Sequence, residues 1–559
     1  MISFQYDSLR RFTNIVYADA TSTRFAYDNN DRPIAITDQR GNTTTFAYDS
    51  NDRVTNITDA AGQTLRYIYD SADRLVGAID RLGRLTSATF SSIGLHGSVT
   101  NKNGNAVRFS YAARRRLTGL TDSGNQVFMF DYDNEARVTS FTNPLNQTNR
   151  VTRDPLGYVI GGTNPAGNSV SLLRDTMKRL IATVDGLFST NFYGYESRGL
   201  LNSASRPGIK TASYTYNALG QLSLVTGLNG EQWKFGYTPM GRMNSSVDPL
   251  NRTNRFSYDN RGRVRQIIFP DATTRSNSYD AAGNLVGQSH SAGPNLQYTY
   301  DALNRLITAN DVGLAYDPQG RITNATSSGV NFGATYDADE RMTNVTYNNG
   351  AFSVGYTYDS RDRLTRVTDS LAGGQIDFVY DNAGRLIGLT HANGVNSIYT
   401  YDAAGRVTRI VDGSIIDIQY ILDAGGQVSQ ANITAPLDPA SFLGNNSSNW
   451  TYNAAHQISN AGYGYDARGR LIASPGHTYA WDGASRLIGI DALTFAYNGL
   501  GKVITSPRGK PPAREYYENM RLEGSARTNK YMTAASDYWL SCYDSGCGFS
   551  QDDTWAGPA

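Results

Sequence analysis

Apolar and polar residues alternate over short stretches of this chain, and polar turns separate the stretches. In the segment 64–69, TLRYIY, Leu65, Tyr67 and Tyr69 share one face of an extended strand, while Arg66 and Ile68 share the other. A period of two residues predicts a β-strand, and β-branched and aromatic residues favour one. Neither face is wholly apolar. The pattern therefore predicts strands with solvent on both sides rather than a sandwich with one apolar face.

The strands recur with a period of 21 residues. From position 6 to position 300, 15 positions stay in phase, and most of them are Tyr. Asp follows at ten of these positions, Gly, Asp or Asn lies four residues on at 11, and Arg lies five residues on at ten. The unit reads Y-D-x-x-[G/D/N]-R-[L/V/M], which is too regular to result from composition alone.

Each residue preference in the unit has a local cause. An Asp side chain can accept hydrogen bonds from the backbone two residues on, and Gly, Asn and Asp best tolerate the positive φ of a tight turn. A second turn follows half a period later, as at 59–62, DAAG, and 248–251, DPLN. Two turns leave two strands of about six residues, so each unit is predicted to be a β-hairpin. Leucine-rich repeats share the period but require a leucine spine, which is absent here.

The spacing of the units changes along the chain. Units are regular over 1–315 and looser over 316–503, where the last ones, at Tyr463, Tyr479 and Phe495, lie 16 residues apart. After Val503 the motif stops, and the sequence becomes polar with Pro and Gly. We therefore expect a repeat domain over 1–503 and an irregular, non-repeat tail over 504–559.

Five units represent the repeat signature. Its residues in these units are Tyr48, Asp49, Arg53, Tyr69, Asp70, Arg74, Tyr258, Asp259, Gly262, Arg263, Tyr401, Asp402, Gly405, Arg406, Tyr465, Asp466, Gly469 and Arg470.

A ribbon of so many short strands cannot stay flat. Each two-stranded unit adds about 9 to 10 Å to the sheet, and the right-handed twist between strands makes a long ribbon coil. Coiling brings distant parts of the ribbon together. The predicted fold class is all-β, with tandem hairpins coiled into a spiral and hollow β-shell that need not be complete.

Composition excludes several classes of function. The 559 residues carry 51 basic and 50 acidic side chains, spread along the whole chain, so no basic stripe indicates binding to nucleic acid. No segment approaches the roughly 20 apolar residues of a transmembrane helix. The chain opens on a unit, Tyr6-Asp7, without a polar cap, which predicts either that an upstream part is missing or that another module covers that edge.

The candidate reactive residues fit structural roles better than chemical ones. The five histidines, His96, His290, His391, His456 and His477, show no metal-binding spacing, so neither a metal nor a cofactor is predicted. The repeated Asp residues are interpreted as turn caps. The repeated Arg residues form a ladder that either pairs with them or binds an acidic cargo, and the Tyr column packs across strands or stacks on sugars. Cys542 and Cys547 are a local disulfide or two free thiols.

The units at Tyr358, Tyr401 and Tyr465, of the form Y-D-x-x-G-R-L with small departures, resemble the YD repeat of the Rhs/teneurin superfamily. This superfamily includes bacterial Rhs proteins, the C component of insecticidal toxin complexes, and teneurins. The resemblance covers roughly 1–503. It implies a large β-shell that in bacterial members encloses a C-terminal toxin, and a secreted or cell-surface location. The self-cleaving core segment that such members carry near the end has no counterpart after Val503.

Three hypotheses for function remain open. The first is a non-enzymatic shell that encloses or presents a polypeptide cargo, with that cargo or an adjacent shell or core module as its partner. The second is a cell-surface adhesion or carbohydrate-binding module, with glycans as partners. The third is a truncated array without independent activity.

Overall fold

The computed structural model describes residues 2–206, 208, 210–371, 373–423, 426–435 and 450–505, together with five later strands between 515 and 551. Its largest sheet has 42 strands, from β1 (Ser3–Tyr6) to β42 (Val428–Thr434). Each strand pairs in antiparallel register with the next strand in the chain. One three-residue 3₁₀ turn, η1 (Ala113–Arg115), is the only helical element among the described residues. The predicted all-β fold of tandem hairpins is confirmed.

The 21-residue period appears directly in the strands. Six-residue strands such as β5 (Thr43–Tyr48) and β7 (Thr64–Tyr69) end on the repeated Tyr, and five-residue strands such as β6 (Val54–Thr58) lie between them. Where β5 pairs with β6, the register shifts at Tyr48, so the hairpin contains a β-bulge. Bulges increase the local twist of a strand pair. One bulge per hairpin, repeated along the ribbon, favours coiling.

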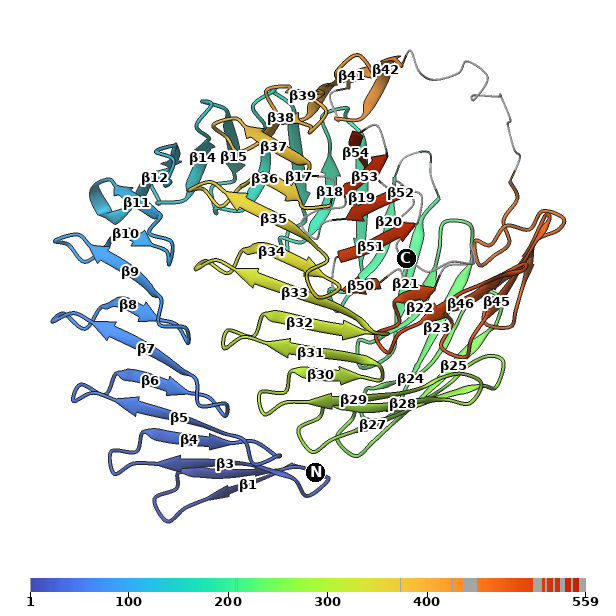
Figure 1. Ribbon diagram of the computed structural model, residues 1–559, viewed down its shortest axis with the longest axis horizontal. Coiled ribbons are helices and arrows are strands. Elements are labelled where there is room, and N and C mark those ends of the chain that lie inside the picture. The colour runs from blue at the N-terminus through green and yellow to red at the C-terminus, as the bar shows by residue number, and fades with distance from the viewer. Residues whose placement is uncertain are drawn as a thin grey trace.

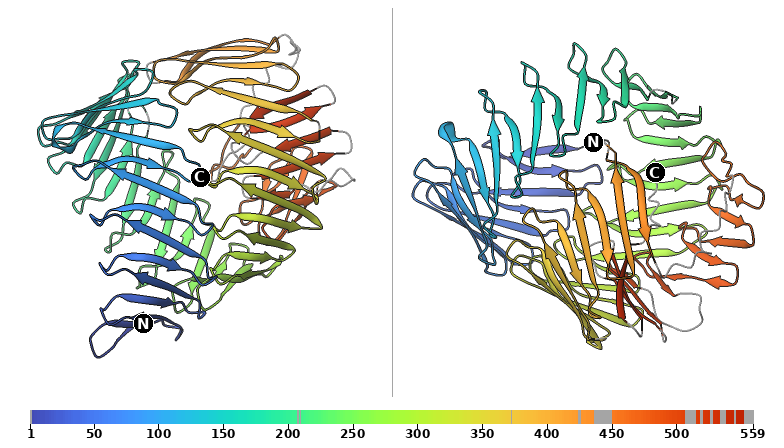
Figure 2. Two further views of the ribbon diagram at one scale, coloured as in Figure 1. Left: turned by 60° about the vertical axis from the view of Figure 1, so that its left-hand side comes forward. Right: turned by 90° about the horizontal axis from the view of Figure 1, so that it is seen from above.

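The ribbon curls into an open spiral that does not close on itself (Figures 1 and 2). Segments far apart in sequence meet where one turn of the spiral lies against the previous one. Along the first of these junctions the hydrogen-bonded residues are 234 to 264 positions apart in the chain. Along a second junction they are 171 to 205 positions apart. These separations give the length of chain between facing points on successive turns.

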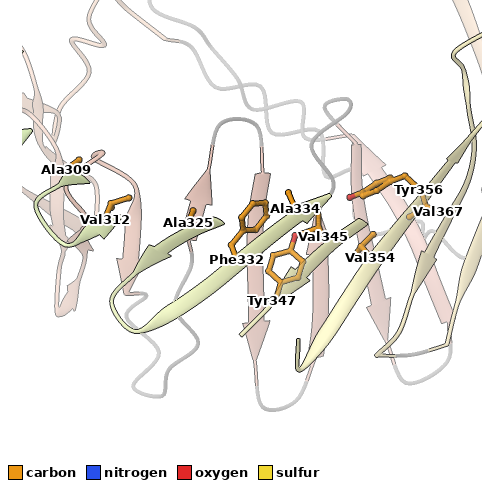
Figure 3. Close-up of a cluster of buried hydrophobic side chains, with 10 residues drawn as sticks. All are labelled: Ala309, Val312, Ala325, Phe332, Ala334, Val345, Tyr347, Val354, Tyr356 and Val367. Carbon is orange, nitrogen blue, oxygen red and sulfur yellow. The ribbon is translucent and has the colours of Figure 1, made fainter. Parts of the chain in front are cut away.

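Burial is low in the first part of the spiral and high in one later region. No residue in β2 (Phe12–Val16) through β7 is fully buried, as expected for a single-layered wall. From β30 (Leu306–Ala309) to β36 (Leu364–Asp369), ten apolar side chains form a buried cluster, with Val345 completely covered. Figure 3 shows the reddish strands of the C-terminal sheet passing behind this cluster. Leu500, from the last repeat units, also packs against the cluster.

Three smaller sheets follow the large one. The first runs from β43 (Gly464–Tyr465) to β47 (Leu493–Thr494), and the second pairs β48 (Ala496–Tyr497) with β49 (Val503–Thr505). The third, from β50 (Glu515–Tyr517) to β54 (Gly546–Gln551), has five strands.

This third sheet lies within 504–559, where the sequence predicts a non-repeat tail, and that division of the chain stays a prediction. The Pro and Gly residues that suggested an irregular tail cluster before Glu515. The later segment DYWLSCYDSGCGF carries aromatic residues on either side of a polar stretch, which is a composition typical of hairpins.

Candidate functional site

The repeated Tyr-Asp motif builds the same turn throughout the spiral. In the turn 49–53, the N–H of Asp52 donates to the carbonyl of Asp49 at 3.3 Å, and the N–H of Asp49 donates to the carbonyl of Arg53 at 3.0 Å. The Asp49 carboxylate accepts the N–H groups of Asn51 and Arg53 at 2.9 and 3.1 Å. Asp52 has a φ of 62°. This is the hairpin loop in which a type I turn is followed by one left-handed residue.

The arginine of each turn fastens its hairpin to the next one. Arg53 donates from Nε to Asp49 at 2.7 Å and from Nη1 to Asp73, in the following hairpin, at 2.6 Å. Its guanidinium lies 4.7 Å from the ring centre of Tyr69. The Tyr69 hydroxyl donates to the carbonyl of Val54 at 3.0 Å. The tyrosine thus packs on an arginine and bonds a neighbouring strand, which combines a cation–π contact with a buried polar end.

The same contacts recur at the other signature residues. Nε of Arg74, Arg263, Arg406 and Arg470 lies 2.6 to 2.7 Å from the carboxylate of Asp70, Asp259, Asp402 and Asp466, respectively. The hydroxyls of Tyr48, Tyr258 and Tyr401 donate to Pro33, Met243 and Leu386. Gly262, Gly405 and Gly469 have φ values of 82° to 86°. Tyr465 lies opposite Leu471 in the β43–β44 (Leu471–Ser474) pair.

In these turns the positive charge of the arginine compensates the negative charge of the aspartate. The Arg53 guanidinium, hydrogen-bonded to Asp49, holds the pKa of that carboxyl below its usual value. Arg32 has the same effect on the pKa of Asp28, and Arg74 on that of Asp70. The ladder of arginines is therefore a structural rim paired with the aspartates. It does not present a row of free cations to an acidic ligand.

The two edges of the ribbon carry different turns. We call the edge formed by turns such as 49–53 the YD edge, and the edge formed by the alternate turns, such as 59–63, the far edge. Where successive turns of the spiral meet, the YD edge of the later turn lies against the far edge of the earlier one. We call this junction the seam. In Figure 1 it runs between the ends of the blue strands and the yellow-green strands.

Ion pairs and backbone hydrogen bonds hold the first stretch of the seam. Lys102, on the far edge, bonds Asp80 at 3.0 Å and Glu340, on the YD edge, at 2.6 Å. Its backbone N–H donates to Asp339 at 2.9 Å. Arg84 donates to the carbonyl of Asp337 at 2.7 Å. Burial lowers the pKa of Lys102, but the two carboxylates outweigh this effect and raise it overall.

Three arginines at one turn position insert into the seam. Arg261, Arg361 and Arg468 each lie two residues after the repeated Asp. Arg361 pairs with Asp122 at 2.6 Å, and Arg468 pairs with Asp271 at 2.7 Å, with only 5% of the Arg468 side chain exposed. The guanidinium of Arg468 also lies 3.9 Å from the ring centre of Phe269. Buried pairs of this kind require close geometry, so they fix how one turn sits on the next.

Sequence reasoning missed this position, because its residue varies from unit to unit. In the first turn of the spiral the same position holds Leu156, Met177, Leu219 and Met240, all largely exposed. The sequence carries no simple signal here, because arginine also holds this position on the free edge, at Arg114 and Arg198, and Leu303 holds it in the seam. The position could be interpreted only with knowledge of which units face each other.

The second stretch of the seam closes on the last repeat units. Gly499 donates its N–H to Asp311 at 3.0 Å, and Asn498, which is 1% exposed, donates to Ser327 at 3.4 Å. At its start, His456 lies 3.3 Å from Glu231 and stacks on Trp233 at 6.0 Å. A polar cleft of about 550 Å³ lies beside this contact.

The other histidines and the cysteines form no reactive centre within the described residues. His96 packs on Phe90, His391 bonds Ser397 at 2.9 Å, and His477 bonds Asp491 at 2.7 Å. His290 is buried, which lowers its pKa. No three His, Cys, Asp or Glu side chains of this part of the chain are grouped to hold a metal ion. Cys542 and Cys547 face each other in the register of β53 (Tyr538–Tyr543) and β54, and their side chains lie outside the described residues.

Comparisons with known proteins agree with this architecture. The family model of the RHS repeat matches residues 27–64, 48–85 and 279–313, and that of the teneurin YD-shell matches 163–278 and 310–432. Together the matches cover more than half of the chain. None of the curated proteins matches it at a significant level. The chain belongs to the Rhs/YD-repeat superfamily, as its units predicted.

One solved structure shows the same fold at low sequence identity. A crystal structure of TcdB2-TccC3-Cdc42 aligns over 97% of this chain with a TM-score of 0.55 and 12% identity. A Photorhabdus luminescens Tc holotoxin pore aligns over 96% with a TM-score of 0.46 and 15% identity. The present chain covers 41% and 32% of those two chains. The first likeness identifies the fold as a YD-repeat shell.

Among the described residues, no helix is long and apolar enough to cross a membrane.

Proposed function

We propose that this protein is a non-enzymatic shell wall that encloses a polypeptide cargo. The observation that carries the proposal is the seam, because it joins successive turns of a single-layered ribbon edge to edge. A wall needs area, curvature and closed joints, and the repeats supply all three without reactive groups. Membership of the YD-repeat superfamily supports the same role. We include in the proposal a secreted or cell-surface location, in keeping with that superfamily.

The proposed enclosure can be tested by protection of an attached peptide. A protease-sensitive epitope would be appended to the C-terminus of the full chain, and its cleavage rate compared between the wild type and an Asp122→Asn, Asp271→Asn double variant. These changes remove the negative charges that pair with Arg361 and Arg468 in the seam. We expect slow cleavage in the wild type and cleavage at least tenfold faster in the variant.

A matched control variant would carry Glu135→Gln and Glu196→Gln, which alter exposed ion pairs on the YD edge of the first turn, outside the seam. This variant should protect the epitope as the wild type does. Equal cleavage of wild type and seam variant, with both proteins folded by circular dichroism, would contradict enclosure.

A second candidate function, glycan binding, is favoured by the cleft at the start of the second seam stretch. Amide, carboxylate and aromatic groups line it, including Asn229, Asp248, Asn251 and the exposed ring of Tyr452. Such a mixture of polar groups with one flat ring suits a sugar. Binding on a glycan array that Tyr452→Ala abolishes would support this function, and an array without any signal would oppose it.

A further inference from the structure

A second cavity in the seam brings three arginines together. It measures about 510 Å³ and lies where the first hairpins, the end of the first turn and the start of the second turn of the spiral converge. Arg242, Arg261 and Arg263 line it together with the ring of Tyr17. Guanidinium groups remain charged at any physiological pH, so the cavity holds three fixed positive charges.

Two of these charges have carboxylate partners. Arg263 pairs with Asp259 of its own turn at 2.6 Å. Arg261 lies 3.4 Å from Asp19, donates to the carbonyl of Ala281 at 2.6 Å, and covers the ring of Tyr17 at 4.3 Å. Both guanidiniums are therefore held in place, and Asp19 is shared, since Arg263 also lies 3.9 Å from it.

The third charge, on Arg242, lacks such a partner. Its turn begins with Thr238 where most units have Asp, and Thr238 supplies a hydroxyl that accepts only the backbone N–H of Arg242, at 3.1 Å. Within the described residues Arg242 forms no ion pair, in contrast to Arg263 one unit later. A half-buried guanidinium without a counter-charge is unfavourable, and an anion in the cavity would remove that cost.

We infer that this cavity binds a small oxyanion, a phosphate or carboxylate group, through Arg242 with support from Arg261 and Arg263. Planar guanidinium groups match the oxygens of both anions and bind them through paired hydrogen bonds. The bound anion would touch residues 242 and 261, which lie in adjacent hairpins, and the hairpin that holds Tyr17 on the preceding turn of the spiral. It would therefore strengthen the seam at its first point.

Arg116 offers a matched control for Arg242. The turn that ends at Arg116 begins with Ala112 in place of the repeated Asp. The guanidinium of Arg116 also packs on a tyrosine of the next hairpin, 5.7 Å from the ring centre of Tyr132. It does not line the cavity. Both arginines lack the aspartate of the repeat, but the turn before Arg116 contains η1, and Arg116 donates to the carbonyl of Asp133 at 3.2 Å.

The test is isothermal titration of the full chain with inorganic phosphate, and separately with acetate, at low ionic strength. We expect saturable binding of at least one anion by the wild type. Arg242→Gln should weaken it about tenfold or more, because one charge-assisted hydrogen bond contributes about 1.5 to 3 kcal/mol. Arg116→Gln should bind as the wild type does.

Thr238→Asp provides a variant that restores the repeat consensus and cannot be dismissed as misfolded. Its carboxylate should occupy Arg242 and abolish anion binding, while the melting temperature stays the same or rises. No saturable binding of either anion by the wild type would overturn the inference. Equal affinities of the wild type, Arg242→Gln and Thr238→Asp would also overturn it, by placing the anion elsewhere.

Discussion

The YD edge has the same hairpin loops in the first circuit of the spiral as in the later circuits. Only in the later circuits does this edge lie against the far edge of the preceding one. Asp49 and Asp359 cap their turns alike, each accepting N–H groups two and four residues on. At the residue two positions after the Asp, the free edge holds Leu156 and Met177 but also Arg198, and the docked edge holds Arg361 and Arg468 but also Leu303. Conserved turn chemistry thus builds the hairpin, while the docking of an edge depends on which turn the spiral brings opposite it.

The strongest way to break this contrast is to remove a seam arginine. Arg468→Gln leaves Asp271 without its partner in a site where the arginine side chain is 5% exposed. Breaking such a pair should lower the free energy of unfolding by about 2 to 3 kcal/mol. Chemical denaturation of the full chain measures this.

Arg198→Gln is the matched control, because Arg198 holds the same turn position on the free edge and its ion pair with Glu196 is exposed. Exposed pairs contribute at most about 1 kcal/mol. Equal losses in the two variants would show that docking does not distinguish the edges.

A pair of opposite substitutions tests the turn that both edges share. Gly262 has a φ of 86°, and a side chain there would meet Arg242. Gly262→Ala should cost about 1 to 2 kcal/mol. Ala136 occupies the equivalent position with a φ of 63°, and Ala136→Gly should gain up to about 1 kcal/mol because the left-handed conformation suits glycine. Thermal unfolding reports both, and shifts of the same sign would contradict the assigned turn.

Acid should weaken the hairpin turns of the YD edge. In the folded protein the pKa of Asp28, Asp49 and Asp70 lies below the ordinary value of 3.8. Their contribution to stability is therefore complete above about pH 3.8 and is lost as the pH falls through the lower, folded-state pKa. We expect the melting temperature to fall in that range, and Asp49→Asn to shrink the fall. A melting temperature independent of pH below 3.8 would oppose this account.

The smallest effect is expected at the tyrosine hydroxyl that links neighbouring hairpins. Tyr69→Phe keeps the ring under Arg53 but removes the donor to the carbonyl of Val54. The loss should be about 0.5 to 1.5 kcal/mol. Tyr67→Phe is the control, since the hydroxyl of Tyr67 makes no hydrogen bond within the described residues. If the two substitutions cost the same, the hydroxyl bond contributes nothing to the ribbon.

The hairpin, its period and its turn were predictable from the sequence because they depend on residues less than one unit apart. Asp49, Asp52 and Arg53 act within five positions, and local backbone preferences suffice to place them. The seam was not predictable in this way. Which residue faces Arg361 depends on the twist summed over many strands, and a small change per strand would bring a different turn opposite it.

The C-terminal sheet escaped prediction for a different reason. Its strands carry no repeat, so the period that organised the rest of the chain gave no guidance there. The cluster around Val345 was likewise hidden, because β34 (Met342–Tyr347) reads like any other strand of the ribbon. Its burial depends on neighbouring strands and on Leu500, which is more than 150 residues away in the chain.

Because the seam joins unlike edges, every added turn leaves the same two borders exposed as the turn before it. Tandem duplication of the gene segment can therefore lengthen the spiral without requiring a new kind of junction between its turns.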